Sequence, residues 1–372
     1  MIVLGIETSC DETAAAVVET TGDAAKPWRA RSNAIASQTA IHREWGGVVP
    51  EIASRQHVRD ICGVVERALS DAGASMSDID AFAVTQGPGL VGSLLVGVAF
   101  AKATAAALGK PIVAVHHLAG HIESIFLEHG AIPLPSAVLI VSGGHTSLYN
   151  VPAPGVYELV GRTRDDAAGE AYDKVARVLG LGYPGGPIVD RLARGGNDQA
   201  FPLPKQRFTG ADRNPLPADL HTGAGAKPIV EFSFSGLKTA VIRQLQERGV
   251  VLAGKAAAPP DQPVLPANEI ADVCASFQRV VVETLLDRTF NAARLLGARS
   301  VGIAGGVSAN SRLRKDAVAR GEREGLPVFI PAIALSTDNA AMIAAAAMRR
   351  LERGESSAFD FNAQASLPMH VG

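Results

Sequence analysis

Residues 2–19 read IVLGIETSCDETAAAVVE, and this stretch decides the fold class. An apolar run ends at Glu7, a short polar segment follows, and a β-rich run continues from Thr13 to Glu19. Two strand-like runs joined by a tight polar segment are typical of a hairpin. The pattern recurs at residues 137–151, which read AVLIVSGGHTSLYNV. Two hairpins about one domain length apart predict an internal duplication.

A second structural unit also occurs twice. A strand predicted over Ala81–Thr85 leads to Gly87-Pro88-Gly89 and an Ala-rich helix. A strand predicted over Ser300–Ala304 leads to Gly305-Gly306 and another helix. Strands that alternate with helices indicate an α/β architecture.

Length and composition are those of a globular protein with two domains. The chain has 372 residues, of which 47% are apolar and 19% are charged. The formal net charge of -2 shows no overall basic excess of the kind that indicates nucleic-acid binding. The three cysteines lie far apart without a Cys-x-x-Cys pair, so no disulfide framework or thiolate zinc site is implied. This cysteine usage fits a reducing compartment.

Two features bear on membranes and targeting. The N-terminus opens directly into a strand-like run and lacks the basic region and cleavage site of a signal peptide. The longest apolar stretch, Leu90–Leu108, is interrupted by glycine and polar residues. That interruption predicts a buried helix rather than a membrane span. We therefore expect a cytoplasmic protein with no membrane partner.

A pair of histidines is the first candidate for chemistry. His117 and His121 follow a predicted strand and lie four residues apart where a helix begins. Rings at this spacing share one helix face and can reach one metal ion. The alternative is two partly exposed histidines at a helix start. A metallopeptidase with this spacing needs Glu directly after the first histidine, and Leu118 stands there instead.

Glycine-rich loops after predicted strands are the second candidate. Residues 87–92 fit Gly-x-Gly-x-x-Gly, but no acidic residue follows between Ser93 and Ile122 to bind ribose, so a glycine turn that lets a helix approach a sheet or a ligand is favoured over a Rossmann site. Main-chain N–H groups of Ser142–Thr146 could bind a phosphate or carboxylate, although a plain hairpin turn has the same sequence. Thr8–Thr13 and Gly305–Asn310 also follow strands, where open α/β sheets bind ligands.

Acidic residues near glycine turns form a third group. Residues 165–174 are a dense polar run, in which some acids cap a helix and Asp173 lies further along. Gly186 lies in a Tyr-Pro-Gly-Gly-Pro turn, and Asp190 follows one helical turn later. Acids in such positions suit ribose hydroxyl groups.

The motifs along the chain form one ordered set, which is Gly5-Ile-Glu-Thr-Ser-Cys-Asp-Glu12, Thr85-Gln-Gly-Pro-Gly-Leu90, His116-His-Leu-Ala-Gly-His121, Val141-Ser-Gly-Gly-His-Thr146, Gly169-Glu-Ala-Tyr-Asp-Lys174, Tyr183-Pro-Gly-Gly-Pro187, Phe232-Ser-Phe-Ser-Gly-Leu-Lys238, Gly305-Gly-Val-Ser-Ala-Asn310 and Thr337-Asp-Asn339. Each motif alone is modest, but their number and order make the set specific. Together they resemble the motifs of the bacterial tRNA N6-adenosine threonylcarbamoyltransferases, the TsaD family. The resemblance covers almost the whole chain, and only the Pro-rich segment near Pro259–Pro266 is outside it.

The resemblance implies a duplicated actin/sugar-kinase-like (ASKHA) fold with two lobes and a central nucleotide and metal cleft. One lobe would comprise residues 1–130 and 331–372, and the other residues 131–330. It also implies one divalent metal, most often Fe²⁺ and sometimes Zn²⁺, bound by His117, His121 and Asp338. From the residues alone, Asp338 would only be interpreted as part of a helix N-cap.

The reaction implied by the resemblance transfers a threonylcarbamoyl group from threonylcarbamoyl-AMP to N6 of adenosine 37 in tRNAs that read codons beginning with A, and it releases AMP. The partners implied are the tRNA anticodon loop and proteins of the TsaB and TsaE types. Glu12 is the candidate acid–base residue. The residues expected to contact the adenylate or nucleotide are Ile140, Val141, Ser142, Gly143, Gly144, Asp173, Gly186, Asp190 and Asn310.

Three other functions compete with this interpretation. A small-molecule kinase or ATPase of the same fold would transfer phosphate from ATP and would have no use for the histidine pair. A metallopeptidase is disfavoured by Leu118. A non-catalytic nucleotide-binding assembly protein would polymerise or exchange partners without modifying tRNA.

Overall fold

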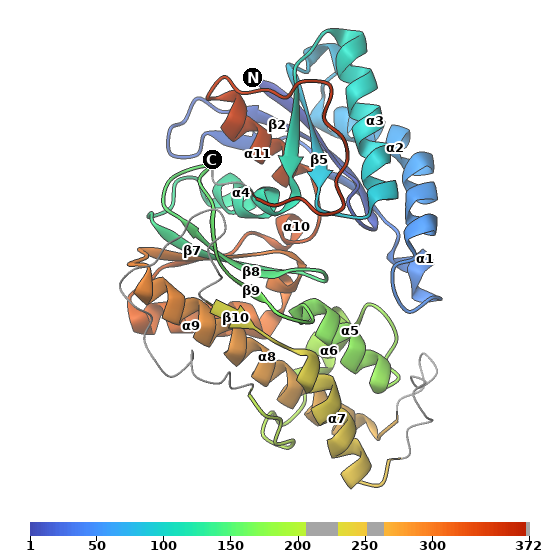
Figure 1. Ribbon diagram of the computed structural model, residues 1–372, viewed down its shortest axis with the longest axis vertical. Helices are drawn as coiled ribbons and strands as arrows, with labels where there is room; N and C mark the ends of the chain where they lie inside the picture. The colour runs from blue at the N-terminus through green and yellow to red at the C-terminus, as the bar shows by residue number, and fades with distance from the viewer. Residues whose placement is uncertain (206–229, 251–263, 370–372) are drawn as a thin grey trace. The chain divides into compact units, whose positions relative to one another are not determined.

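The chain folds into two compact units (Figure 1). The computed structural model describes residues 1–205, 230–250 and 264–369. Unit 1 comprises Met1–Pro133, Val151–Tyr157 and Phe329–Gly372, and unit 2 comprises Leu134–Asn150 and Glu158–Val328. The Pro-rich segment near Pro259–Pro266 lies largely outside the described residues.

Unit 1 is built on a sheet with the strand order β3-β2-β1-β5-β6, in which β4 also pairs with β2. Its strands are β1 (Ile2–Glu7), β2 (Glu12–Thr20), β3 (Trp28–Ala30), β4 (Ala34–Ser37), β5 (Ala81–Gly87) and β6 (Ile112–His116). Its helices are α1 (Thr39–Arg43), α2 (Pro50–Ala72), η1 (Met76–Asp78), α3 (Val91–Leu108), α4 (His117–His129), α10 (Ile333–Ser336) and α11 (Ala340–Leu351).

Unit 2 is built on a second sheet with the order β10-β9-β8-β7-β11-β12. Its strands are β7 (Ser136–Val141), β8 (Thr146–Val151), β9 (Glu158–Thr163), β10 (Val230–Phe232), β11 (Ser300–Ala304) and β12 (Val328–Phe329). Its helices are α5 (Ala168–Val178), α6 (Gly185–Ala193), α7 (Ser235–Glu247), α8 (Ala267–Leu295), η2 (Gly306–Ala309) and α9 (Ser311–Glu324).

The two sheets repeat one topology, which confirms the predicted duplication. The first hairpin, β1 and β2, corresponds to β7 and β8, which are also sheet neighbours. The strand of each strand–glycine–helix unit then pairs in parallel with the first strand of its hairpin, β5 with β1 and β11 with β7. The predicted α/β class is therefore confirmed. Because paired parallel strands end at the same sheet edge, the loops that follow β1 and β5, and those that follow β7 and β11, gather at one edge of each sheet.

Helices cover both faces of the sheet in unit 1 (Figure 1). Leu4 and Ile6 of β1 point into an apolar core that also contains Ile61 of α2 and Val98 of α3. Gly5, between them, faces α11: a Cβ there would lie 2.3 Å from the carbonyl oxygen of Ala340. The strand alternation therefore places α2 and α3 on one face, while α11, packed also against α4, approaches the other face to backbone contact.

Helix α3 is buried on one face only. Its inner face is buried, including Leu94 and Val98, but Val91 and Leu95 are each 51% exposed. By length and composition α3 is the one helix among the described residues that could cross a membrane, a criterion that core helices of other proteins also meet. The predicted burial therefore holds for the face that packs on the unit, because an apolar composition does not say which faces of a helix its neighbours cover.

A buried charge cluster holds the C-terminal helix of unit 1 in place. Glu123 of α4 is fully buried, and its carboxylate accepts hydrogen bonds from Arg349 of α11 at 2.9 Å and from the hydroxyl of Tyr157 at 2.6 Å. The Arg349 guanidinium also stacks over the ring of Trp28, with 4.3 Å to the centroid. A buried carboxylate is tolerated only when it is paired in this way.

We expect Arg349→Met to destabilise the protein by about 3–5 kcal/mol, because it leaves the Glu123 charge buried without its partner. Urea unfolding followed by circular dichroism measures this change. Arg353→Met is the matched control, since Arg353 pairs with Glu355 where both side chains are over 40% exposed, and such pairs contribute little. Equal midpoints for the two variants would show that the buried pair does not stabilise the unit.

Candidate functional site

The histidine pair lies where β6 passes into α4. His116 caps the helix: its Nδ1 accepts a hydrogen bond from the Leu118 N–H at 3.1 Å, and its Nε2 lies 2.9 Å from the carbonyl oxygen of Leu367. The helix therefore begins at His117, and His117 and His121 occupy one helix face, as predicted. Their rings meet edge to face with 4.8 Å between centroids.

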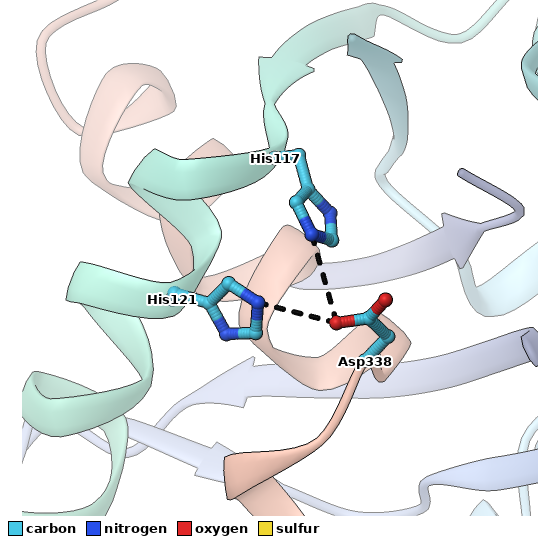
Figure 2. A group of neighbouring side chains, drawn as sticks. All are labelled: His117, His121 and Asp338. Carbon is cyan, nitrogen blue, oxygen red and sulfur yellow. Dashed lines mark ion pairs between the residues drawn. The ribbon is translucent and has the colours of Figure 1, made fainter. Parts of the chain in front are cut away.

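Asp338 joins the two histidines, although it lies far away in the sequence. Its Oδ1 is 3.2 Å from Nε2 of His121 and 3.6 Å from Nε2 of His117 (Figure 2). Asn339, the next residue, is the side chain that caps α11, by accepting from the Met342 N–H at 3.0 Å. The Asp338 carboxylate is thus directed at the histidines, and the neighbouring asparagine performs the capping. One ligand atom from each of the three residues lies within 4.8 Å of the others.

The chemistry of this group fits a metal ion. His121 is fully buried, its Nδ1 has no hydrogen-bond partner among the residues that the structure describes, and its Nε2 has only the Asp338 carboxylate, at 3.2 Å. A cation beside Asp338 Oδ1 would be bound by the lone pair of Nε2 and would balance the carboxylate charge at a site where both side chains are shielded from water. Burial and the neighbouring His117 lower the pKa of His121, so it carries the neutral form that binds metals. Two histidines and one carboxylate leave coordination positions open, as catalytic iron and zinc sites require.

His117 differs from His121 in its electrostatic surroundings. Burial opposes its charge, but the carboxylates of Asp338 and Glu7 outweigh burial and raise its pKa to about 9. Glu7 Oε2 lies 3.0 Å from Nδ1 of His117, on the side of the ring opposite the cluster. The metal-free protein therefore holds a proton on His117 at neutral pH. The contact between Glu7 and His117 was not predicted from the sequence. The one signal for it was an acidic residue at the end of an otherwise apolar strand.

Glu12, the predicted acid–base residue, is the first residue of β2 and directly follows the acidic loop that leaves β1. Burial, Asp11 and Asp338 raise the pKa of Glu12 well above its usual value. Ser37 donates a hydrogen bond to Glu12 at 3.2 Å. The loop is anchored by His57, a buried residue of α2 whose Nε2 lies 3.0 Å from the carbonyl oxygen of Cys10.

The glycines at 87 and 89 serve packing rather than nucleotide binding. A Cβ at Gly87 would lie 2.1 Å from the Gln364 carbonyl oxygen, and one at Gly89 would lie 2.6 Å from that of Ser9. The Leu90 N–H donates to the same Ser9 oxygen at 2.8 Å. Of the two roles predicted for this glycine turn, the close approach of neighbouring backbone is the one that the structure shows.

In unit 2 the loop after β7 offers main-chain atoms. The carbonyl of Ser142 accepts from the Gly169 N–H at 3.2 Å, which sets the loop against the start of α5. Gly143 and Gly144 are exposed, and a Cβ on either would meet open space. Ile140 and Val141, by contrast, are fully buried. These two residues can offer a ligand only main-chain atoms at the end of the strand.

The other residues predicted to contact substrate surround the same edge of the sheet in unit 2. Asp173 accepts from the Gly185 N–H at 2.7 Å, next to Gly186, where a Cβ would meet open space. Asp190 accepts from the hydroxyl of Ser311 at 2.8 Å, and Asn310 caps α9 by accepting from the Leu313 N–H at 2.9 Å. Asn310 also donates to Gln278 at 2.7 Å. Gln278 lies on α8 outside every motif in the sequence, so its hydrogen bond with Asn310 could not be predicted.

Comparison with known proteins identifies the family. The family model described as "TsaD: tRNA N6-adenosine threonylcarbamoyltransferase" matches residues 29–345. The chain belongs to the TsaD family. A relative from Moorella thermoacetica with that enzyme name is 50% identical over 99% of this chain and 97% of its own length. One from Anaeromyxobacter dehalogenans, also so named, is 50% identical over 97% of both chains.

The fold of this TsaD-family chain is also found in a distant solved structure. Full-length HypF, solved in a phosphate- and nucleotide-bound form, matches 94% of this chain and 56% of that chain with a TM-score of 0.55 and 13% identity. The likeness concerns the fold alone. Together with the duplicated sheet order, it confirms the actin/sugar-kinase-like fold that the motifs predicted.

We expect metal affinity of the TsaD-family site to increase with pH. Because the pKa of His117 is about 9, a metal must displace its proton below that pH, and the competition fades as pH approaches 9. The proton itself stabilises the metal-free fold below about pH 6.5, and this stabilisation is lost as pH rises through about 9. Zinc competition with a chelator between about pH 6 and 9 measures the trend. A flat profile would contradict it.

Proposed function

We propose that this chain is a tRNA N6-adenosine threonylcarbamoyltransferase. It transfers the threonylcarbamoyl group from threonylcarbamoyl-AMP to N6 of adenosine 37 in tRNAs that read codons beginning with A, and AMP leaves. The observation that carries this proposal is the cluster of His117, His121 and Asp338. It occurs in a chain that matches relatives with this enzyme name over nearly their whole length.

The reaction sets a clear chemical demand. The exocyclic amine of adenine is a poor nucleophile because its lone pair is delocalised into the ring, so activation falls on the carbamoyl partner. When bound, a divalent metal supplies a Lewis acid for a carbonyl oxygen. His117, His121 and Asp338 would hold that ion, and Fe²⁺ is proposed with Zn²⁺ as the alternative, since imidazole and carboxylate suit both. An anticodon-loop adenine is accessible because it can be splayed out of its stack.

The adenylate is proposed to bind unit 2. Main-chain N–H groups of Ser142, Gly143 and Gly144 suit its phosphate, which becomes the leaving group. The open space beside Gly186, at the N-terminus of α6, also suits a phosphate or ribose. Asp173 and Asp190 are acceptors for ribose hydroxyls. Ile140, Val141 and Asn310 would shape the pocket through packing and capping.

Glu12 is proposed to take the proton that the amine loses. A carboxyl with a raised pKa is a stronger base once ionised, and it titrates nearer to neutral pH than a free carboxyl does. The location in the cytoplasm and the partners of the TsaB and TsaE types are further parts of the proposal, and they rest on the family resemblance. Shared RNA binding fits a chain with net charge -2.

The kinase or ATPase alternative is not favoured by any described feature, because the histidine pair has no role in phosphoryl transfer. The peptidase alternative lacks its general base, since Leu118 occupies that position and is buried. Assays for ATP-dependent phosphorylation of small substrates and for proteolysis distinguish these functions from acyl transfer.

The direct test supplies threonylcarbamoyl-AMP and tRNA to the purified protein, with and without the two partner proteins, and measures modified adenosine and bound metal. We expect His117→Ala and His121→Ala to lose the metal and to reduce transfer by at least about 100-fold, because a lost metal ligand removes the Lewis acid. His129→Ala is the control, as His129 is exposed at the far end of the same helix. Full transfer by a metal-free variant would refute the Lewis-acid role.

For Glu12→Gln we expect the rate of transfer to fall by about 100-fold, because a glutamine side chain cannot accept the proton. A raised pKa means that the carboxyl stays protonated to higher pH, so the wild-type rate should rise as pH passes through that pKa. The glutamine variant should lack this acidic limb. Glu19→Gln, in the same strand, is the control. Identical pH profiles for Glu12→Gln and the wild type would exclude Glu12 as the base.

A further inference from the structure

We propose that Glu7 is the positioning residue for the metal ligand His117: its carboxylate accepts the Nδ1–H and thereby directs Nε2, without a proton, toward the ion. The proposal rests on the proposed metal site and names a residue that lies outside the ligand set. Glu7 would not touch the substrate or the reacting atoms. It would act through the orientation and tautomer of one imidazole ring.

The first observation is that Glu7 is a fully buried carboxylate with a complete set of donors. It is the last residue of β1 and has no exposed surface. Its Oε2 lies 2.7 Å from the hydroxyl of Thr85 and 3.0 Å from Nδ1 of His117, and its Oε1 accepts from the Ser9 N–H. Burying a carboxylate costs free energy unless hydrogen bonds compensate for the lost water. Three donors directed at this one side chain provide that compensation.

The second observation concerns the proton on His117. An ionised carboxylate only accepts hydrogen bonds, so the Thr85 hydroxyl and the His117 Nδ1 must both donate to Glu7. A neutral imidazole carries one N–H, and placing it on Nδ1 leaves a lone pair on Nε2. That nitrogen is the one that faces Asp338 Oδ1 and His121 in the cluster (Figure 2). Glu7 thus selects the tautomer that a metal ligand requires.

The third observation is the contrast between the two histidines. Nδ1 of His121 has no hydrogen-bond partner among the described residues, whereas Nδ1 of His117 faces Glu7 and also lies 3.3 Å from the Ser9 hydroxyl. The ring orientation of His117 is therefore set by the surrounding protein, and that of His121 depends on Asp338 and the ion. Removing Glu7 should weaken a ligand that is otherwise preorganised.

The position of Glu7 also links the ligand to the acidic loop. Ser9, whose N–H binds Glu7, accepts the Leu90 N–H through its own carbonyl, and Gly89 leaves the space for that approach. The carboxylate therefore connects the ends of β1 and β5 with the first turn of α4. Glu12 is the first residue of β2, three residues after Ser9, so the loop that Glu7 anchors through Ser9 leads directly to the candidate base.

The test compares zinc affinity, by competition with a chelator, in the full-length protein carrying Glu7→Gln, Thr85→Val or Asp165→Asn. We expect Glu7→Gln to weaken zinc binding by about 10- to 100-fold, the usual effect of losing such a support. Thr85→Val removes one donor and should have a smaller effect. Asp165→Asn changes a carboxylate of unit 2 that also accepts hydrogen bonds from the Phe234 N–H and the Ser235 hydroxyl, and its zinc affinity should match that of the wild type.

A second readout is the ¹⁵N NMR spectrum of His117 in the zinc-loaded protein. The wild type should show a proton on Nδ1 and none on Nε2, and Glu7→Gln should disturb this state. Loss of zinc in His121→Ala together with wild-type affinity in Glu7→Gln would overturn the role of Glu7 while the metal site stands. Retained zinc in His121→Ala would instead refute the site itself. If Glu7→Gln does not fold, Thr85→Val must still weaken zinc binding, and unchanged affinity there counts against the proposal.

Discussion

A buried hydrogen bond between the ring of His117 and the carboxylate of Glu7 underlies the organisation of unit 1. Glu7 ends the central strand of its sheet, and His117 begins the helix that follows the edge strand β6. Because a buried carboxylate needs donors, Thr85, Ser9 and His117 are all drawn to it. With Nδ1 of His117 directed at Glu7, the other ring nitrogen, Nε2, points toward Asp338.

The duplicated scaffold explains why chemistry gathers where it does. In each unit a hairpin and a parallel strand end at the same sheet edge, and the loops that leave this edge carry small or polar residues. In unit 1, Glu12 directly follows the loop after β1. The His117 cluster lies where the next parallel strand, β6, ends. In unit 2 the loops at this edge hold Ser142–Gly144 and Gly305–Asn310. One folding pattern thus supports an acidic, metal-suited group in one unit and a main-chain site suited to anions in the other.

Much of the fold was predictable because its signals are local. Alternation and turn residues defined both hairpins, and a strand followed by glycine and a helix recurred in both halves. The burial of α3 was not predictable in this way: its apolar residues surround the helix, and only contacts with α2 and β5 determine the covered side. Val91 and Leu95 therefore remain half exposed although their sequence context resembles a core helix.

The sequence by itself determined the helical spacing that places His117 and His121 on one face, because the α-helical period is a property of the local backbone. It also placed the glycine loops after strands and excluded the peptidase base through Leu118. The family resemblance named Asp338, but only the tertiary structure shows its carboxylate beside both rings and the Glu7 carboxylate beside Nδ1 of His117. Strand pairing and the packing of α11 bring these residues together, and no local pattern encodes contacts between segments so far apart in the chain.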